Sequence, residues 1–102
     1  MAQIHTLSPH EASQKIAKNA IAIIDIRDAR SYQAGHIANA KHLLFKDFPA
    51  FIEKISKLQA ILIYCYHGIS SQAAAQYLSE QGFQEVYSLQ GGFEAWQSSL
   101  SK

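Results

Sequence analysis

The chain has 102 residues, of which 48% are hydrophobic and 17% are charged, and its formal net charge is +1. This length and balance predict one globular domain over residues 1–102, with no sign of disorder. The nine Lys and Arg residues are scattered rather than clustered, so we expect no nucleic-acid surface, and no apolar run is long enough for a membrane span.

The cysteine content indicates the compartment. A single cysteine cannot form an internal disulfide, and with five dispersed His it gives no metal-ligand spacing, so no metal or other cofactor is expected. The first residues, MAQIHTLSPHEASQ, lack the basic and then apolar layout of a secretory signal. We therefore expect a cytoplasmic protein.

The first segment predicts a strand and a helix. Residues 3–7 alternate weakly, as in a short strand. Ser8, Pro9 and Glu11 have the spacing of an N-cap, a first-turn proline and a capping-box partner. The helix is expected to run from Pro9 to about Lys18.

The second segment predicts a buried strand followed by a short helix. Residues 20–25 are almost continuously apolar, as in a strand covered on both faces. Asp25 and Arg27 follow, and we expect them to form an ion pair that fixes the turn rather than to catalyse. Residues 28–35 predict a short helix with a terminal glycine. His36 is then expected to be partly buried and hydrogen-bonded.

The third segment predicts a short strand and a longer helix. Residues 41–44 are a possible strand, and residues 47–58 show helical spacing of apolar residues. The spaced residues are Phe48, Phe51, Ile52, Ile55 and Leu58. Arg30 and Lys46 are candidates to attract an anionic ligand.

The last segments predict two strands, each followed by a helix. Residues 60–65 form the most apolar strand, and residues 70–82 a helix with a glycine after its last turn. Residues 85–89 predict a fifth strand and residues 91–100 a closing helix, in which Phe93 and Trp96 have the spacing of core contacts.

This alternation of strands and helices favours parallel βαβ units. The expected fold is a three-layer α/β domain with about five strands. The alternative, an antiparallel α+β fold, would need hairpin turns such as Asn-Gly between strands, and the sequence has none.

Cys65 stands where a predicted parallel strand ends and a helix is about to begin. A lone cysteine there is often an inert apolar residue, but open α/β sheets also bind ligands at this edge. The segment from Tyr66 to Ser70 contains no proline, so each residue offers a backbone N–H, and Gly68 permits a left-handed turn. The segment can therefore surround the sulfur with N–H groups.

Such a loop would favour the thiolate. A free thiol has a pKa of about 8.5, and a helix N-terminus contributes ~0.3–1 kcal/mol, against about 1.36 kcal/mol for each pKa unit. Several N–H donors would lower the pKa further. The hydroxyls of Ser70 and Ser71 are further donors, or alternatively helix N-caps. Tyr66, His67 and Ile69 complete the candidate substrate-binding loop, and we expect His67 to shape the loop or contact substrate rather than to move protons.

Three reactions use a thiolate held in this way. A cysteine phosphatase needs an Arg to clamp the phosphoryl oxygens, and the sixth residue after Cys65, where its pattern has Arg, is Ser71. Thiol–disulfide exchange would need a second cysteine nearby, which the chain lacks. Transfer of a sulfane sulfur through a persulfide needs neither group.

Several motifs together resemble the single-domain rhodanese family. They are DIRDARSYQAGHIANA, the loop CYHGISS with the following AAQYLSEQGF, and VYSLQGGFEAW. The matches run in the family's order from Asp25 to Trp96. The resemblance implies a parallel five-stranded sheet with helices on both faces. It also implies a thiosulfate sulfurtransferase in which Cys65 carries a persulfide and passes sulfur to cyanide or a thiol, for which thioredoxin is a candidate.

Two residues depart from the family pattern. Ile69 stands where close relatives have Asn, and Ser70 where many rhodaneses have Arg or another polar residue. A loop that acts through its main chain tolerates Ile69, whereas the lack of a loop cation bears on thiosulfate affinity. The alternative function is a sulfur-relay or protein-interaction module of the same fold. A small cysteine phosphatase is disfavoured by the missing Arg.

Overall fold

A computed structural model describes residues 5–18 and 20–100, with the backbone alone at residue 100. Five strands form one sheet in the order β1-β5-β4-β2-β3, and every pair of neighbours is parallel. The strands are β1 (His5–Leu7), β2 (Ile21–Asp25), β3 (Lys41–His42), β4 (Ala60–Tyr64) and β5 (Val86–Leu89). The helices are α1 (Pro9–Ala17), α2 (Ala29–Ala34), α3 (Phe48–Lys54), α4 (Ser70–Glu80) and α5 (Gly92–Leu100), with a 3-10 turn η1 (Phe45–Asp47) before α3. The predicted parallel five-stranded α/β fold is confirmed.

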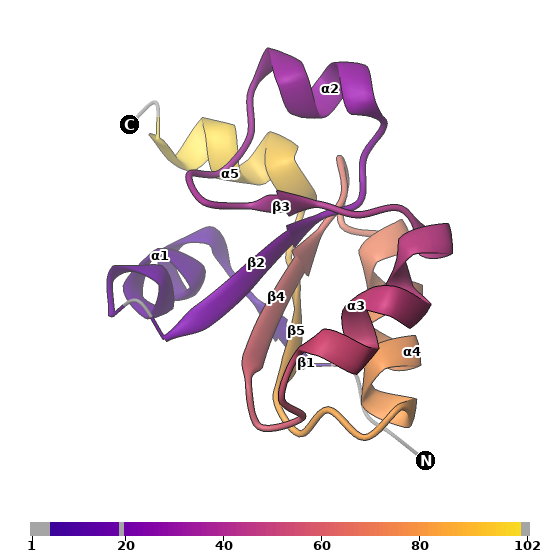
Figure 1. The fold of residues 1–102 in the computed structure, drawn as a ribbon. Helices are drawn as coiled ribbons and strands as arrows, with labels where there is room; N and C mark the ends of the chain where they lie inside the picture. The colour runs from indigo at the N-terminus through magenta and orange to yellow at the C-terminus, as the bar shows by residue number, and fades with distance from the viewer. Residues whose placement is uncertain (1–4, 19, 101–102) are drawn as a thin grey trace.

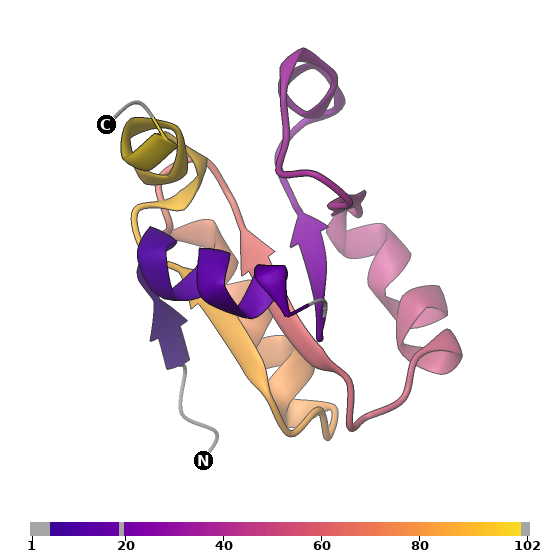
Figure 2. The same ribbon diagram turned by 90° about the vertical axis from the view of Figure 1, so that its left-hand side faces the viewer.

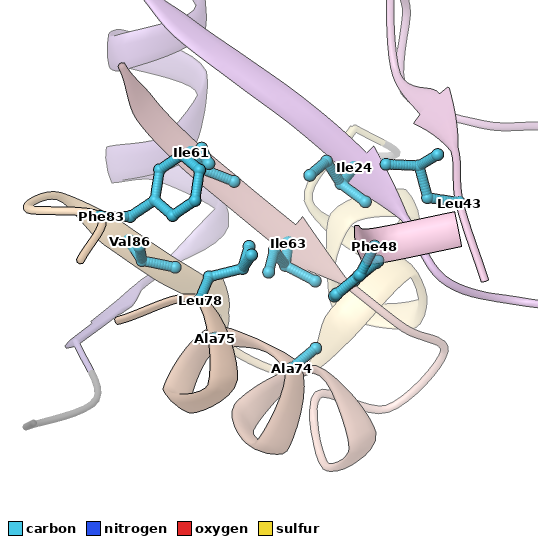
Figure 3. Close-up of a cluster of buried hydrophobic side chains, with 10 residues drawn as sticks. All are labelled: Ile24, Leu43, Phe48, Ile61, Ile63, Ala74, Ala75, Leu78, Phe83 and Val86. Atoms are coloured by element: carbon cyan, nitrogen blue, oxygen red, sulfur yellow. The ribbon is translucent and has the colours of Figure 1, made fainter. Parts of the chain in front are cut away.

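Helices cover both faces of the sheet (Figure 1). On one face α3 and α4 pack against β2, β4 and β5 through Phe48, Ala74 and Leu78, and Figure 3 shows these side chains meeting Ile24 and Ile63. On the other face α1 and α5 contribute Ala12, Phe93 and Trp96 to a second core that includes Leu62 and Leu89. The predicted core role of Phe93 and Trp96 is therefore confirmed, and β4, central in the sheet, is held from both sides.

The start of α1 follows the predicted capping box. The Glu11 amide donates to Ser8 Oγ at 3.1 Å, and the Ser8 amide donates to Glu11 Oε1 at 2.9 Å. The helix ends at Ala17, one residue before the expected Lys18. Of the predicted strand over residues 3–7, residues 3 and 4 lie outside the described residues.

The helix predicted over residues 47–58 is shorter than expected. It ends at Lys54, Ile55 is already extended, and Leu58 is 72% exposed instead of lying on the buried face. The chain turns here because Ser56 competes with the helix for hydrogen bonds, accepting the Gln59 amide on its carbonyl and the Leu58 amide on its side chain.

The third strand is also shorter than the predicted residues 41–44. It pairs with β2 only at Lys41 and His42. Leu43 still donates its amide to the carbonyl of Asp25, but the Leu44 amide turns to the Asp47 carboxylate and opens η1. Figure 2 shows the result, with β3 beside only the carboxyl end of β2.

Among the helices of residues 5–18 and 20–100, none has the length and apolar character needed to cross a bilayer.

Candidate active site

Cys65 is the first residue after β4, in the loop that leads to α4 (Figure 1). The central position of β4 brings the loop to the middle of the sheet's carboxyl edge. The residue is 7% exposed, so most of its surface faces protein. The sulfur is thus held against the loop that follows it.

Three hydrogen-bonding groups surround the Cys65 sulfur. The amides of Gly68 and Ser71 donate to Sγ at 3.1 Å and 3.4 Å, and the Ser71 hydroxyl lies 3.5 Å from it. Gly68 belongs to the loop and Ser71 to the first turn of α4. The amide of Gly68 agrees with the prediction that main-chain N–H groups between Tyr66 and Ser70 turn toward the sulfur, whereas the Ser71 amide lies one residue beyond that segment.

The Ser71 hydroxyl is itself fixed by a second serine. Its Oγ lies 2.7 Å from Oγ of Ser88 on β5, and both residues are buried. With a thiolate at Cys65, Ser88 donates to Ser71 and Ser71 donates to the sulfur, which forms a short relay across two elements. The sequence reasoning missed Ser88. The only local signal was a serine inside the apolar segment VYSL.

The surroundings favour the ionised form of Cys65. Burial raises the pKa of the thiol, but hydrogen bonds from the Ser71 hydroxyl, the Ser71 and Gly68 amides and the His67 amide outweigh it. The pKa therefore lies below the usual value for cysteine. A thiol with a depressed pKa exposes more thiolate near neutral pH, and the thiolate is the nucleophile.

The N-terminus of α5 orients the loop from behind. The Phe93 amide donates to the carbonyl of Cys65 at 2.8 Å, and the Glu94 amide donates to the carbonyl of Tyr66 at 3.1 Å. These are donors that the first turn of a helix leaves without partners inside the helix. Because two loop carbonyls are held toward α5, the amides that follow are free to turn toward the sulfur.

Two glycines make this close approach possible. Gly92 has a φ of 62°, and a Cβ there would lie 2.5 Å from the carbonyl oxygens of Cys65 and Tyr66. Gly68 has a φ of 86°, and a Cβ there would lie 2.8 Å from the amide nitrogen of Gly91. Both positions combine a left-handed backbone with no room for a side chain, so no other residue fits without a shift.

The remaining loop residues face outward. Ile69 is 74% exposed and Tyr66 47% exposed, and His67 lies on the surface with Nδ1 3.7 Å from Glu94 Oε1. Ser70 is exposed and caps nothing, because Ile69 occupies the N-cap of α4 without a side-chain hydrogen bond. The alternative that Ser70 or Ser71 caps the helix is therefore wrong, since the first turn donates its Ser71 amide to sulfur instead.

Asp25 and Arg27 form the predicted ion pair. The Arg27 guanidinium reaches Asp25 Oδ2 at 2.7 Å, and Asp25 is fully buried. Arg27 also donates to the carbonyl of Gly35 at 2.6 Å and stacks 4.1 Å above the ring of Phe93. Contrary to prediction His36 is exposed, although it makes the expected hydrogen bond, to the carbonyl of Tyr32, because it follows α2 on its outer side.

A small cavity of about 200 Å³ lies beside the loop. Its lining includes Tyr66, Arg27 and Phe93. Lys46 lines a different cavity, next to α3, together with Lys41 and Lys54.

Comparison with known proteins gives a consistent result. A family model described as "Rhodanese-like domain" matches residues 8–99. The protein named thiosulfate sulfurtransferase GlpE from Coxiella burnetii is 52% identical over 92 residues, which cover 90% of this chain and 86% of that one.

Solved structures share the fold. The solution structure of the rhodanese-like domain of the Anabaena Alr3790 protein has a TM-score of 0.83 and 25% identity, covering 95% of this chain and 76% of that one. A protein of unknown function from Rhodopseudomonas palustris, described as a possible tyrosine phosphatase, has a TM-score of 0.81 and 26% identity, covering 94% of this chain and 81% of that one.

Proposed function

Because this chain belongs to the family of rhodanese-like domains, we propose that it is a sulfurtransferase that moves the sulfane sulfur of thiosulfate on Cys65. The likeness to a protein named thiosulfate sulfurtransferase over most of both chains supports this activity. The observation that carries the assignment of Cys65 is the set of donors around its sulfur, from Gly68 and Ser71.

In the first half-reaction the Cys65 thiolate attacks the outer sulfur of thiosulfate. A new S–S bond forms between Cys65 and that sulfur, the original S–S bond breaks, and sulfite leaves with the electron pair. Cys65 then carries a persulfide anion. No proton has to move in this step once the thiol is ionised, which fits a loop where no side chain is placed as a base.

The outer persulfide sulfur needs donors of its own. The amides of Ile69 and Ser70 donate to no acceptor within the described residues 5–18 and 20–100. They lie in the same loop as the amides that already bind Sγ, and we assign them, with Tyr66 and His67, to the substrate-binding loop. In the second half-reaction cyanide or a thiolate attacks the outer sulfur, and the Cys65 thiolate is released.

A protein thiol such as that of thioredoxin is the acceptor that we propose alongside small thiols, because Tyr66 and Ile69 present apolar surface around the loop. A cytoplasmic location is proposed with it, since an unpaired catalytic thiol is preserved in a reducing compartment.

The experiment combines intact mass with steady-state kinetics. The protein loaded with thiosulfate and freed of excess is expected to gain the mass of one sulfur atom and to lose it on adding cyanide. Cys65→Ser stays folded and gains none, whereas His67→Ala retains at least part of its activity. Varying thiosulfate at several cyanide concentrations gives parallel double-reciprocal lines, because sulfite leaves before the acceptor attacks.

Two results would contradict this mechanism. One is substantial turnover by Cys65→Ser. The other is a set of intersecting lines with no mass gain, which would mean direct transfer in a ternary complex. Hydrolysis of p-nitrophenyl phosphate is the control for the phosphatase alternative, and none is expected because the loop has no Arg or Lys to neutralise the phosphoryl oxygens.

A further inference from the structure

One side of β2 is largely without a partner strand. All five residues of β2 pair with β4, but on the opposite side β3 pairs only with Ile24 and Asp25. Within residues 5–18 and 20–100, no strand pairs with residues 21–23 on that side. An incomplete sheet edge of this kind is a ready template for another extended chain.

The main-chain groups of this edge point outward. The carbonyl of Asp25 accepts from Leu43, so the peptide groups of Asp25 face β3. Along a strand, alternate residues face the same neighbour. The amides of Ile21 and Ile23 therefore face the unpaired edge.

The unpaired edge opens into a groove. A cavity of about 250 Å³ runs along residues 21–24 of β2, with Ile16 of α1 on one side and Phe51 of α3 on the other. Lys41 and Phe51 are shared with a second cavity of about 620 Å³ between β3, η1 and α3. The two cavities adjoin and give an apolar floor along an extended strand edge.

Three cations from three elements line this groove. Lys41 of β3 lines both cavities, and Lys46 of η1 and Lys54 of α3 line the larger one. In the part of the chain that the structure describes, none of them forms an ion pair. The acidic residue of the same lining, Asp47, already accepts the Leu44 amide. The lysines are scattered in the sequence, and only the fold brings them together.

We propose that this groove binds an extended acidic segment of a partner protein, which adds a strand to the free edge of β2. The partner's backbone pairs with the amides of Ile21 and Ile23. Its apolar side chains point to the α1 side and lie on Ile16, and its carboxylates, on the opposite face of the added strand, reach the three lysines on the α3 side. This site is separate from the loop of Cys65, because no loop residue lines either cavity.

The charge of the groove argues against a second copy of this chain as the occupant. A symmetric dimer through this edge would bring the same lysines of two copies together, and like charges across an interface are unfavourable. A lysine on an edge strand also serves to prevent such pairing. Lys46 and Lys54 lie on other elements, however, and their positions fit attraction of an acidic chain.

The test uses a short fluorescent peptide that alternates glutamate with valine and isoleucine. We expect saturable binding by fluorescence anisotropy, weakened by salt, with slower hydrogen exchange at the amides of Ile21 and Ile23. The backbone control is a pair of peptides, each N-methylated at every second residue. One carries the methyl groups on the edge that faces β2, and the other carries them on the opposite edge. Methylation on the edge that faces β2 abolishes binding, whereas methylation on the other edge leaves it intact.

The matched protein variants carry the same change in net charge. The double variant Lys46→Glu, Lys54→Glu is expected to bind the peptide more weakly by roughly tenfold or more. The double variant Arg30→Glu, Lys57→Glu, which alters cations that line neither cavity, is expected to bind normally. Equal weakening by both pairs, equal binding of both methylated peptides, no saturable binding, or a dimer that the peptide dissociates would each overturn the proposal.

Discussion

At the scale of single residues, Ser88 acts on the Cys65 sulfur only through Ser71. Its hydroxyl lies 2.7 Å from that of Ser71, which in turn lies 3.5 Å from the sulfur. A donor that reaches a reactive group through another side chain sets the orientation of that side chain. Ser88 is thus a positioning residue, and its removal leaves the Ser71 hydroxyl free to rotate away.

We predict that Ser88→Ala raises the pKa of Cys65. The hydrogen bonds that lower this pKa stabilise the thiolate, so weakening one moves the midpoint of thiolate formation to higher pH. The rate of iodoacetamide alkylation against pH measures the midpoint, and Ser98→Ala on the outside of α5 is the control. An unchanged midpoint in Ser88→Ala would show that the Ser71 hydroxyl stabilises the thiolate without its hydrogen bond to Ser88.

Ile69 tests whether the loop acts through its main chain. Its side chain is exposed, so Ile69→Asn is predicted to change the rate of sulfur transfer only modestly. Ile69→Pro removes an amide, and the loss of one donor to an anion costs about 2.7–4 kcal/mol in comparable sites. Transfer from thiosulfate to cyanide measures both variants. Full activity in a folded Pro variant would remove this amide from the mechanism.

Cys65 and Gly68 could be predicted from the sequence, but Ser88 could not. A strand end followed by a glycine-containing loop is local information, available within a few residues. The contact between Ser71 and Ser88 depends on β4 and β5 lying side by side. The two serines are 17 residues apart, so no local sequence pattern indicates their contact. A serine within an apolar strand is equally compatible with a small buried residue that has no role in the site.

At the scale of elements, α5 can donate hydrogen bonds to the loop of Cys65 only because Gly92 lets the backbone of the helix approach the backbone of the loop. We predict that Gly92→Ala destabilises the protein and slows sulfur transfer. A left-handed backbone at a non-glycine residue costs about 1–3 kcal/mol, and the clash with the carbonyls of Cys65 and Tyr66 adds to it. Urea denaturation gives the free energy of unfolding.

Gly35→Ala is the matched control for Gly92→Ala. Gly35 has an extended φ of 167°, and a Cβ there meets nothing within 4 Å. The change is expected to alter the free energy of unfolding by less than about 0.5 kcal/mol. Equal losses in the two variants would mean that the contact of α5 with the loop has no special role.

The order and type of the elements followed from apolar periodicity and from caps such as Ser8 with Glu11. The residue at which α3 ends did not follow from these patterns. Apolar spacing continues to Leu58, although the helix ends at Lys54. The hydrogen bonds of Ser56 that end it depend on the chain returning to β4, which is a tertiary requirement.

At the scale of the whole molecule, Arg27 ties the sheet to two helices. It pairs with the buried Asp25, donates to the carbonyl of Gly35 after α2 and stacks on Phe93 of α5. We predict that Arg27→Met lowers the free energy of unfolding by about 3–5 kcal/mol, because it leaves a buried carboxylate without its partner.

The double variant Asp25→Asn, Arg27→Met separates charge from packing. With the buried charge removed as well, much of the lost stability is expected to return, since replacing a buried ion pair by neutral groups is often close to neutral. Urea denaturation of the two variants under one condition checks this. A double variant no more stable than Arg27→Met would assign the loss to packing.

The position of β5 and α5 after β4 in the chain has a consequence for the order in which the protein becomes active during synthesis. On the ribosome, β4 and Cys65 emerge well before Ser88, Gly92 and the rest of α5. Until those residues arrive, the Ser71 hydroxyl has no partner on β5 and the loop carbonyls have no donors. The nascent thiol therefore keeps a more ordinary, weakly reactive character, and the reactive thiolate is fully stabilised only when β5 has paired with β4 and α5 has reached the loop.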